Sequence, residues 1–315
     1  MAEKIATRDA YGNTLVELAE THDFVVLDAD LAAATKTAVF AKQYPERHFN
    51  CGIAEGNMMS VAAGIAATGI PVFASSFAMF ASGRAFEQVR NSIGYPHLNV
   101  KICATHAGVT VGEDGATHQC LEDLGVMRTI PGMTVVNPAD AVEAAAAVRA
   151  AIAYNGPMYF RFGRSAVPVL FDKATYKFEL GKGIKLTDGN DVAIVATGIT
   201  LHMALEAAET LKNEGIAARV IDVHTVKPID RELLTLAARE CGAVVTAEEH
   251  NVIGGLGSAV AETLSETCPV PVLRVGVDDV FGRSGSAADM LVMYGITPEH
   301  IAARAREAVQ LKKSR

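Results

Sequence analysis

Two histidines flank an acidic, glycine-containing segment in the first half of the chain. The stretch GEDGATHQ (residues 112–119) contains two acids, a threonine and His118, and His106 stands just upstream in KICATHAG. Carboxylates and imidazoles in one loop can transfer protons or bind a metal ion. A metal site is disfavoured, because no third imidazole and no His-Glu-x-x-His spacing accompanies His106, Asp114 and His118. A solvated loop is the alternative, although glycines and a histidine after a strand are typical of a ligand-facing turn.

The bulk composition limits the class of protein. The chain has 315 residues, half of them apolar and a fifth charged, which is enough for two globular domains. The formal net charge of −8, without a lysine or arginine cluster, argues against a nucleic-acid-binding protein. No apolar stretch is long enough to span a bilayer, and MAEKIATRDAYG lacks the apolar segment of a signal peptide. The 5 cysteines are widely spaced and include no C-x-x-C pair, so we expect reduced thiols and a cytoplasmic protein.

Short β-branched runs alternate with alanine-rich helical patterns in the first half. The predicted strands are residues 24–30, 71–76, 99–105, 133–138 and 158–162, and the predicted helices are residues 55–68, 77–93 and 139–153. Strands that alternate with helices in this way indicate parallel sheets with helices on both faces. The sequence therefore predicts an α/β fold.

A polar, aperiodic stretch at residues 171–190 interrupts the alternation, after which strand and helix patterns resume. We therefore expect two successive parallel-type sheets flanked by helices. The predicted organisation is a first domain at 1–175, a linker at 176–190 and a second domain at 191–315. The glycine run GGLGSA (254–259) is more typical of a tight helix entrance than of a dinucleotide-binding loop.

Polar residues stand where several predicted strands end. Asp28 and Asp30 end the first strand, His106 follows the third, and Arg164 follows the fifth. Because ligands of open parallel sheets bind beyond the carboxyl ends of the strands, we expect these side chains near one site. Glu55 opens a predicted helix, where a carboxylate can be simply a favourable partner of the helix dipole or a functional group.

Several motifs together resemble the second half of transketolase. They are RHFNCGIAEGNM (47–58), FAMF (77–80), THAGVTVGEDGATHQ (105–119), GMTVVNPAD (132–140), YFRFGRSAVP (159–168), IDVHTVKPID (221–230), AEEHNVIGGLGSAV (247–260) and FGRSGSAADMLVMYGI (281–296). The resemblance covers nearly the whole chain. It implies a thiamine-diphosphate pyrimidine-binding domain followed by a transketolase C-terminal domain, the latter with a role in packing and assembly.

The resemblance implies that thiamine diphosphate is the cofactor. In the family, the glutamate that matches Glu55 hydrogen-bonds N1′ of the aminopyrimidine and so promotes loss of the C2 proton. Glu55 is therefore expected to be both catalytic and cofactor-binding. Met58, Phe77 and Phe80 match the apolar wall that holds the pyrimidine ring, with Asp30 as a further cofactor-binding residue.

The same resemblance assigns contacts along the sugar. His118 matches a residue beside the reacting carbonyl and, with His106, is expected to be catalytic. Asp114 matches the carboxylate that receives the C2 hydroxyl of the acceptor. His106, Arg164 and Arg8 match the contacts to the phosphate end, where guanidinium groups suit a phosphate. Arg8 is expected just before the first helix.

Two positions depart from the family pattern. Gly83 stands where many transketolases have a third aromatic residue, so that side of the pyrimidine ring is expected to be more open. Ala34, followed by Thr35, occupies the position of a serine that the family usually has at the phosphate end, four residues after the aspartate that matches Asp30. This second departure predicts altered substrate length or phosphate affinity.

The chain has no Gly-Asp-Gly motif, with which the family binds Mg²⁺ (or Ca²⁺) and the diphosphate in another domain. The resemblance therefore implies the C-terminal subunit of a split transketolase, which would bind no metal itself. We expect an N-terminal partner subunit with the diphosphate-binding domain, and an α2β2 assembly. The reaction would move a two-carbon ketol unit from a ketose phosphate to an aldose phosphate, as in the pentose phosphate pathway. A 1-deoxyxylulose-5-phosphate synthase-like or 2-oxoacid-processing enzyme is an alternative, as is a non-enzymatic scaffold subunit.

Overall fold

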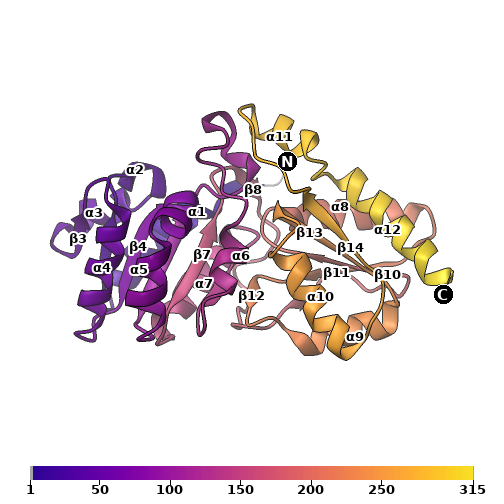
Figure 1. Ribbon diagram of the computed structural model, residues 1–315, viewed down its shortest axis with the longest axis horizontal. Coiled ribbons are helices and arrows are strands. Elements are labelled where there is room, and N and C mark those ends of the chain that lie inside the picture. Colours follow the sequence, from indigo (N-terminus) through magenta and orange to yellow (C-terminus); the bar gives the residue numbers. More distant parts are fainter. Residues whose placement is uncertain (1–2, 315) are drawn as a thin grey trace.

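Strands and helices alternate along residues 3–314, the part of the chain that this computed structural model describes (Figure 1). The strands of the first half are β1 (Lys4–Ala6), β2 (Val25–Asp28), β3 (His48–Asn50), β4 (Val72–Phe77), β5 (Val100–Thr105), β6 (Thr134–Val136), β7 (Met158–Phe162) and β8 (Ala166–Pro168). Its helices are α1 (Thr7–Ala19), α2 (Ala32–Thr35), α3 (Ala38–Gln43), α4 (Glu55–Ala66), α5 (Phe86–Gln88), α6 (Asp123–Arg128) and α7 (Ala141–Ala153).

The second half continues the alternation. Its strands are β9 (Ile184–Lys185), β10 (Val192–Ala196), β11 (Ala218–Asp222), β12 (Thr225–Lys227), β13 (Val244–Asn251) and β14 (Val272–Val277). Its helices are α8 (Thr200–Asn213), α9 (Arg231–Cys241), α10 (Leu256–Thr267), α11 (Ala287–Met293) and α12 (Pro298–Lys313).

Two large sheets lie side by side along the molecule (Figure 1). The first has 7 strands in the order β12-β6-β7-β5-β4-β2-β3, and the second has 5 in the order β14-β13-β10-β11-β9. All neighbours pair in parallel except β12 with β6 and β9 with β11, and β1 and β8 form a separate antiparallel pair. The predicted α/β fold with two parallel-type sheets is therefore confirmed.

Helices cover both faces of the first sheet, so its central strands are buried on both sides. Successive residues of a strand point to opposite faces. Phe73 and Phe160 pack in the core beneath α1 and α7, whereas Ala74 and Tyr159 pack in the core beneath α4. A strand buried on both faces is rich in apolar residues, and β4 and β5, which are mostly apolar, are buried throughout.

The helix predicted at residues 77–93 was wrong at its start and in its regularity. Strand β4 continues through Phe77, which pairs with Thr105 of β5. A π-helical turn (Met79–Arg84), the short α5 and a second π-helical turn (Val89–Gly94) follow in place of one α-helix. Strand pairing therefore overrides the helical pattern of the sequence at Phe77.

A strand from the second half completes the first sheet. Strand β12 pairs antiparallel with β6, with Thr225 opposite Val136. The Lys227 ammonium then donates to the carbonyl oxygens of Arg128 and Ile130, at 2.8 and 2.6 Å, at the carboxyl end of α6. These contacts fasten the two halves to each other away from the loops at the carboxyl ends of the strands.

The glycine run at residues 254–259 is a helix entrance, as expected. Helix α10 begins at Leu256, and the Glu248 carboxylate accepts hydrogen bonds from the amide nitrogens of Leu256 and Gly257, at 2.6 and 2.8 Å. A carboxylate at this position satisfies free N–H groups of the first turn.

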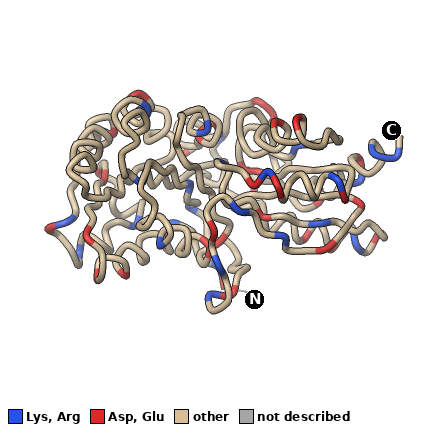
Figure 2. The backbone as a smooth tube through the Cα atoms, turned by 90° about the horizontal axis from the view of Figure 1, so that it is seen from below, with Lys and Arg blue, Asp and Glu red and all other residues tan. Residues whose placement is uncertain are grey.

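The surface carries both signs of charge. Figure 2 shows acidic and basic residues interspersed over both halves of the molecule. The cysteines are free thiols, three of them buried. Among residues 3–314, no helix combines the length and the apolar character needed to cross a membrane.

Two carboxyl groups meet in the buried boundary between the halves. Glu143 of α7 and Asp222 at the end of β11 are fully buried. The Glu143 carboxylate accepts hydrogen bonds from the Ala139 amide and the Tyr176 hydroxyl, whereas Asp222 faces Glu143 without a donor of its own. Two ionised carboxylates cannot hydrogen-bond to each other, because neither has a donor. The contact is therefore a hydrogen bond only when one of the two groups is protonated. Burial raises the pKa of both groups, and that of Asp222 well above its usual value.

This pair predicts that the protein loses stability as the pH rises. A carboxyl group whose pKa is raised by folding stabilises the native state most in acid, and that contribution declines above the pKa of the unfolded state. Asp222→Asn keeps a hydrogen-bond donor without the titration. In urea titrations we compare the unfolding free energies of Asp222→Asn and the wild type. The difference, variant minus wild type, should increase by at least about 1 kcal/mol from pH 5 to pH 8, because only the wild type loses this contribution. The exposed Asp23→Asn is the control, and an equal pH dependence in Asp222→Asn and the wild type would refute the shared proton.

Candidate active site

The loop between β5 and α6 carries most of the predicted site residues. It begins at His106, whose φ of 56° lies in the left-handed region, and continues through Gly108 (φ 82°), Gly112 (φ 81°) and Gly115 (φ 73°). Glycine adopts this conformation without strain, but a histidine does so at a cost of roughly 1 kcal/mol. The 3₁₀ segment Val109–Asp114 lies between Gly108 and Gly115 and is kinked at Gly112. The loop therefore folds back sharply, and its polar side chains gather at the edge of the sheet.

Four aromatic rings form a cluster at this edge. The ring centroids of Phe77 and His106 are 3.9 Å apart in a stacked arrangement. Phe80 stacks on Phe77 at 5.8 Å and meets the ring of His118 edge-on at 5.3 Å. Phe77 ends β4, Phe80 lies in the π-helical turn, and the histidines come from the loop. The structure therefore brings together the two predicted cofactor-binding rings and the two predicted catalytic histidines.

Glu55 lies beside this aromatic cluster. It is the first residue of α4 and is 2 % exposed, with Met58 fully buried one turn later. Nη1 of Arg84 is 2.9 Å from each oxygen of its carboxylate. The guanidinium carbon of Arg84 is also 4.5 Å from the centroid of the Phe80 ring, a cation–π distance. Arg84 is not among the site residues predicted from the sequence. Arg84 follows Phe80 by four residues on a helical segment, and this spacing could have indicated the contact between the two side chains.

Gly83 is exposed and lines an open pocket together with Ser82 and Phe86. A Cβ atom at Gly83 would lie 2.3 Å from Cε of Met79, so the flexible Met79 side chain covers one side of the glycine. A more open side of the pyrimidine ring at this position stays a prediction.

His106 is a neutral hydrogen-bonding group. Nη1 of Arg8 lies 3.1 Å from its Nε2, and Thr105 Oγ1 lies 2.8 Å from its Nδ1. A guanidinium can only donate, so Nε2 accepts and Nδ1 carries the proton. Burial, and after it the charges of Arg8 and Arg164, lower the pKa of His106 to about 3. Arg8 lies within the first turn of α1 rather than before it, because the helix begins at Thr7.

Arg164 binds the acidic loop in this structure. Its Nη1 donates to the carbonyl oxygen of Val111 and lies 3.4 Å from the Asp114 carboxylate and 3.6 Å from that of Glu113. All three charged side chains are at least a third exposed, so these ion pairs are weak and can exchange partners. Arg164 and Asp114 are thus neighbours, on the same side of the loop as the Arg8–His106 pair.

Asp30 lies apart from the aromatic cluster. It has a φ of 64°, is exposed, and its carboxylate accepts a hydrogen bond of 2.9 Å from the Asn50 amide. The buried Asp28 instead accepts from the hydroxyls of Thr35 and Thr37, at 2.7 and 2.8 Å. Burial raises the pKa of Asp28 while these hydrogen bonds oppose the rise. Thr35 therefore cannot replace the serine of the family, since its hydroxyl is held inside the turn by Asp28.

The second half of the chain holds the loop from the other side. Glu249 of β13 is buried, and its Oε1 accepts a hydrogen bond of 2.6 Å from the amide nitrogen of Thr110. Gln119 donates to the carbonyl oxygen of Arg283, at 2.8 Å, in the segment before α11. Figure 1 shows α11 beside this loop. Neither contact could be identified from the sequence, because each joins residues more than a hundred positions apart.

A buried ion pair forms the centre of this boundary. Nε of Arg161 is 2.9 Å from Oδ2 of Asp123, the first residue of α6. Nη2 of Arg161 donates to the carbonyl oxygen of Glu249 at 2.8 Å. The hydroxyl of Tyr159 donates to the same Asp123 carboxylate at 2.9 Å. The charge of Arg161 is thereby satisfied, as a buried guanidinium requires.

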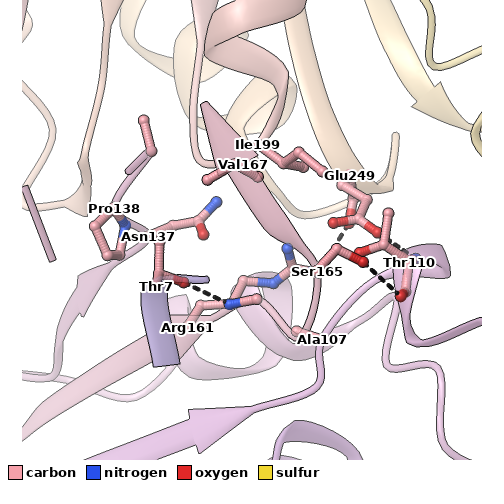
Figure 3. Close-up of a pocket in the computed structure, with 12 residues that line it drawn as sticks. Thr7, Ala107, Thr110, Asn137, Pro138, Arg161, Ser165, Val167, Ile199 and Glu249 are labelled. Atoms are coloured by element: carbon pink, nitrogen blue, oxygen red, sulfur yellow. Dashed lines mark hydrogen bonds between the residues drawn. The ribbon is translucent and has the colours of Figure 1, made fainter. Parts of the chain in front are cut away.

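The cavity next to Arg161 is too small for a substrate. Figure 3 shows Thr7, Asn137, Ser165 and Glu249 around it, with Arg161 at its floor. Its volume is about 20 Å³, which accommodates a single water molecule but not a sugar or a cofactor. We therefore take the edge that carries Glu55 and the aromatic cluster as the candidate site.

Comparisons with known proteins identify this arrangement. Residues 3–169 match a family model described as the pyrimidine binding domain of transketolase, and residues 181–301 match the transketolase C-terminal domain. The chain belongs to the transketolase family. The resemblance drawn from the motifs is thereby confirmed.

Similar proteins include split and full-length forms. A solved structure titled as a split gene transketolase, an inactive beta4 tetramer, is 56% identical with a TM-score of 0.91, covering 98% of this chain and 100% of that chain. A 6-deoxy-6-sulfo-D-fructose transketolase subunit of Clostridium sp. (strain MSTE9) is 46% identical, over 98% of this chain and 96% of the relative. Transketolase of Homo sapiens is 38% identical over 97% of this chain but only 49% of its own length.

The contact of Glu249 with the loop can be tested at two glycines of similar positive φ. Gly108 (φ 82°) would place a Cβ 2.2 Å from the Glu249 carboxyl carbon, whereas Gly215 (φ 80°) has nothing within 4 Å. We expect Gly215→Ala to lower the unfolding free energy by about 1 kcal/mol, the strain of a positive φ. Gly108→Ala should cost at least about 2 kcal/mol more, because Glu249 must move and because a ψ of −178° at positive φ is unfavourable for alanine. Equal costs for the two variants in chemical denaturation would show that the loop does not rest on Glu249.

Proposed function

We propose that this chain is the C-terminal subunit of a thiamine-diphosphate-dependent transketolase, which transfers a two-carbon ketol unit from a ketose to an aldose. The observation that supports this most directly is Glu55, a buried carboxylate that opens α4 and is linked through Arg84 to the ring of Phe80. A carboxyl group and an aromatic wall are what an aminopyrimidine ring needs for a hydrogen bond to a ring nitrogen and for stacking.

The site fits the pyrimidine of the cofactor but not its diphosphate. Within residues 3–314, no group of three His, Cys, Asp or Glu side chains is placed to hold a metal ion. We therefore assign Mg²⁺ (or Ca²⁺) and the diphosphate to an N-terminal partner subunit. This division agrees with the similarity to a split gene transketolase and with the match to about half of the human enzyme. We propose that the two subunits form an α2β2 assembly. We further propose that this assembly acts in the pentose phosphate pathway in the cytoplasm.

Each side chain of the site has a proposed task in this reaction. When bound, thiamine diphosphate supplies a nucleophilic carbon once its C2 proton is lost. Glu55 holds the proton at the pyrimidine nitrogen that makes this loss possible. His118, half-buried on the aromatic cluster, donates a hydrogen bond to the oxygen of the reacting carbonyl. Asp114 accepts the hydrogen bond of the C2 hydroxyl of the acceptor.

The anionic end of the sugar is proposed to bind at Arg8, His106 and Arg164. His106 is neutral, so the positive charge at this end comes from the two guanidinium groups. Nε of Arg8 is buried without an acceptor, and the ion pairs of Arg164 are exposed. A guanidinium fork suits any tetrahedral anion. We propose that this anion is a phosphate. One similar protein is named a 6-deoxy-6-sulfo-D-fructose transketolase subunit, so a sulfonate is the nearest alternative.

Reconstitution with the partner subunit tests the proposal. The chain alone should bind little cofactor and show no transketolase activity, because the metal-binding half of the site is absent. Addition of the partner should restore both, and NMR should then detect rapid exchange of the C2 proton. Glu55→Gln should fold and assemble normally but slow that exchange by about two to four orders of magnitude, since an amide cannot supply the proton. Robust turnover by the purified chain alone, or wild-type exchange rates in Glu55→Gln, would contradict the proposal.

The assignment of Arg164 to the anionic end can be tested with matched acceptors. Loss of a charge-assisted contact costs about ten- to a hundredfold in binding. Arg164→Ala should therefore raise KM by that factor for phosphorylated aldoses and change the reaction with glycolaldehyde less than about twofold. Glu113→Gln, which removes the other carboxylate beside Arg164, is the control and should leave both substrates unaffected. Equal losses on both acceptors would mean that Arg164 serves the loop alone.

A further inference from the structure

Arg84 contacts two of the groups proposed to hold the pyrimidine ring. Its guanidinium hydrogen-bonds both oxygens of Glu55 at 2.9 Å and lies 4.5 Å from the centroid of the Phe80 ring. Glu55 is 2 % exposed, whereas the Arg84 side chain is 55% exposed. The arginine therefore lies between the carboxylate and the solvent.

A guanidinium and an aminopyrimidine can each occupy the position between Glu55 and the Phe80 ring, because the two groups have several features in common. Both are planar, both stack against aromatic rings, and both present nitrogen atoms that bind a carboxyl group in their plane. The carboxyl oxygens engaged by Arg84 are the atoms that would have to meet the pyrimidine nitrogen.

The local backbone supports a side chain that can leave. Arg84 ends the π-helical turn Met79–Arg84, four residues after Phe80, which places its guanidinium over that ring. It follows Gly83, which has no side chain to confine it. Water can hydrate the exposed guanidinium, but withdrawal of Arg84 leaves the buried Glu55 without a partner until the cofactor provides one.

We propose that Arg84 is a latch on the cofactor site, which occupies the place of the pyrimidine in the cofactor-free subunit and must swing away before thiamine diphosphate binds. This inference rests on the proposed role of Glu55. The latch protects a buried carboxylate from being left unpaired while the site is empty. It belongs to the free state, so its removal should change how fast the cofactor binds and not how fast it leaves.

The test measures association and dissociation of radiolabelled thiamine diphosphate by rapid filtration, on the chain reconstituted with its N-terminal partner and Mg²⁺. Arg84→Gln should bind the cofactor about three- to tenfold faster, with a dissociation rate within about twofold of wild type. Arg84→Lys, which keeps the charge but lacks the planar guanidinium that lies over the Phe80 ring, should fall between them. Arg90→Gln, at an exposed arginine in the next π-helical turn, is the matched control and should behave as wild type.

An unchanged association rate in Arg84→Gln, or faster dissociation, would overturn the latch, because Arg84 would then be inert or would support the bound cofactor. Glu55→Gln in the same complex separates this failure from failure of the proposed function. If Glu55→Gln slows C2 proton exchange while Arg84→Gln binds cofactor like wild type, the latch alone is wrong. If Glu55→Gln leaves exchange unchanged, the proposed role of Glu55 is wrong, and with it the basis of the latch.

Discussion

The carboxylate of Glu249 accepts a hydrogen bond from the amide nitrogen of Thr110 across the boundary between the two halves of the molecule. The loop that it holds has left-handed backbone at His106 and at three glycines, a conformation that an isolated loop would not keep. Beneath it, the buried pair of Arg161 and Asp123 fixes the start of α6. A pair of this kind is costly to break, because either partner alone would be an uncompensated buried charge. The position of His106, Asp114 and His118 therefore depends on contacts from the C-terminal domain.

The site has two ends of different charge. Glu55 lies at one end against an aromatic wall, where its carboxylate is shielded from solvent. Arg8 and Arg164 lie at the other end, where burial, and after it their positive charge, lowers the pKa of His106 and keeps it neutral. A ligand with an aromatic ring at one end and an anion at the other meets a complementary surface. The proposed ketol transfer places the cofactor ring and the sugar phosphate at these two ends.

Much of the fold, but less of the site, could be predicted from the sequence. Strands such as β4 and β5 are recognisable because most residues of a strand buried on both faces are apolar. The pattern at residues 77–93 predicts a helix at Phe77, because the pairing of Phe77 with Thr105 is a long-range contact that no local pattern records. Strand β12 is too short to recognise, and its partner β6 lies in the other half. Glu55 and the loop residues lie in motifs that resemble a known family. Arg84 lies outside these motifs, and the motif at residues 247–260 contains Glu249 but does not reveal its contact with Thr110.

The proposed function requires Glu55 to face the pyrimidine of a cofactor whose diphosphate is held by another chain. A structure of the chain in complex with its partner subunit, Mg²⁺ and thiamine diphosphate measures this directly. We predict an oxygen of Glu55 at about 2.6–3.0 Å from N1′ of the pyrimidine, with the ring against Phe80, Arg84 turned into solvent and the metal ligands all on the partner. A pyrimidine nitrogen bound to another group, with Arg84 still on Glu55, would contradict it.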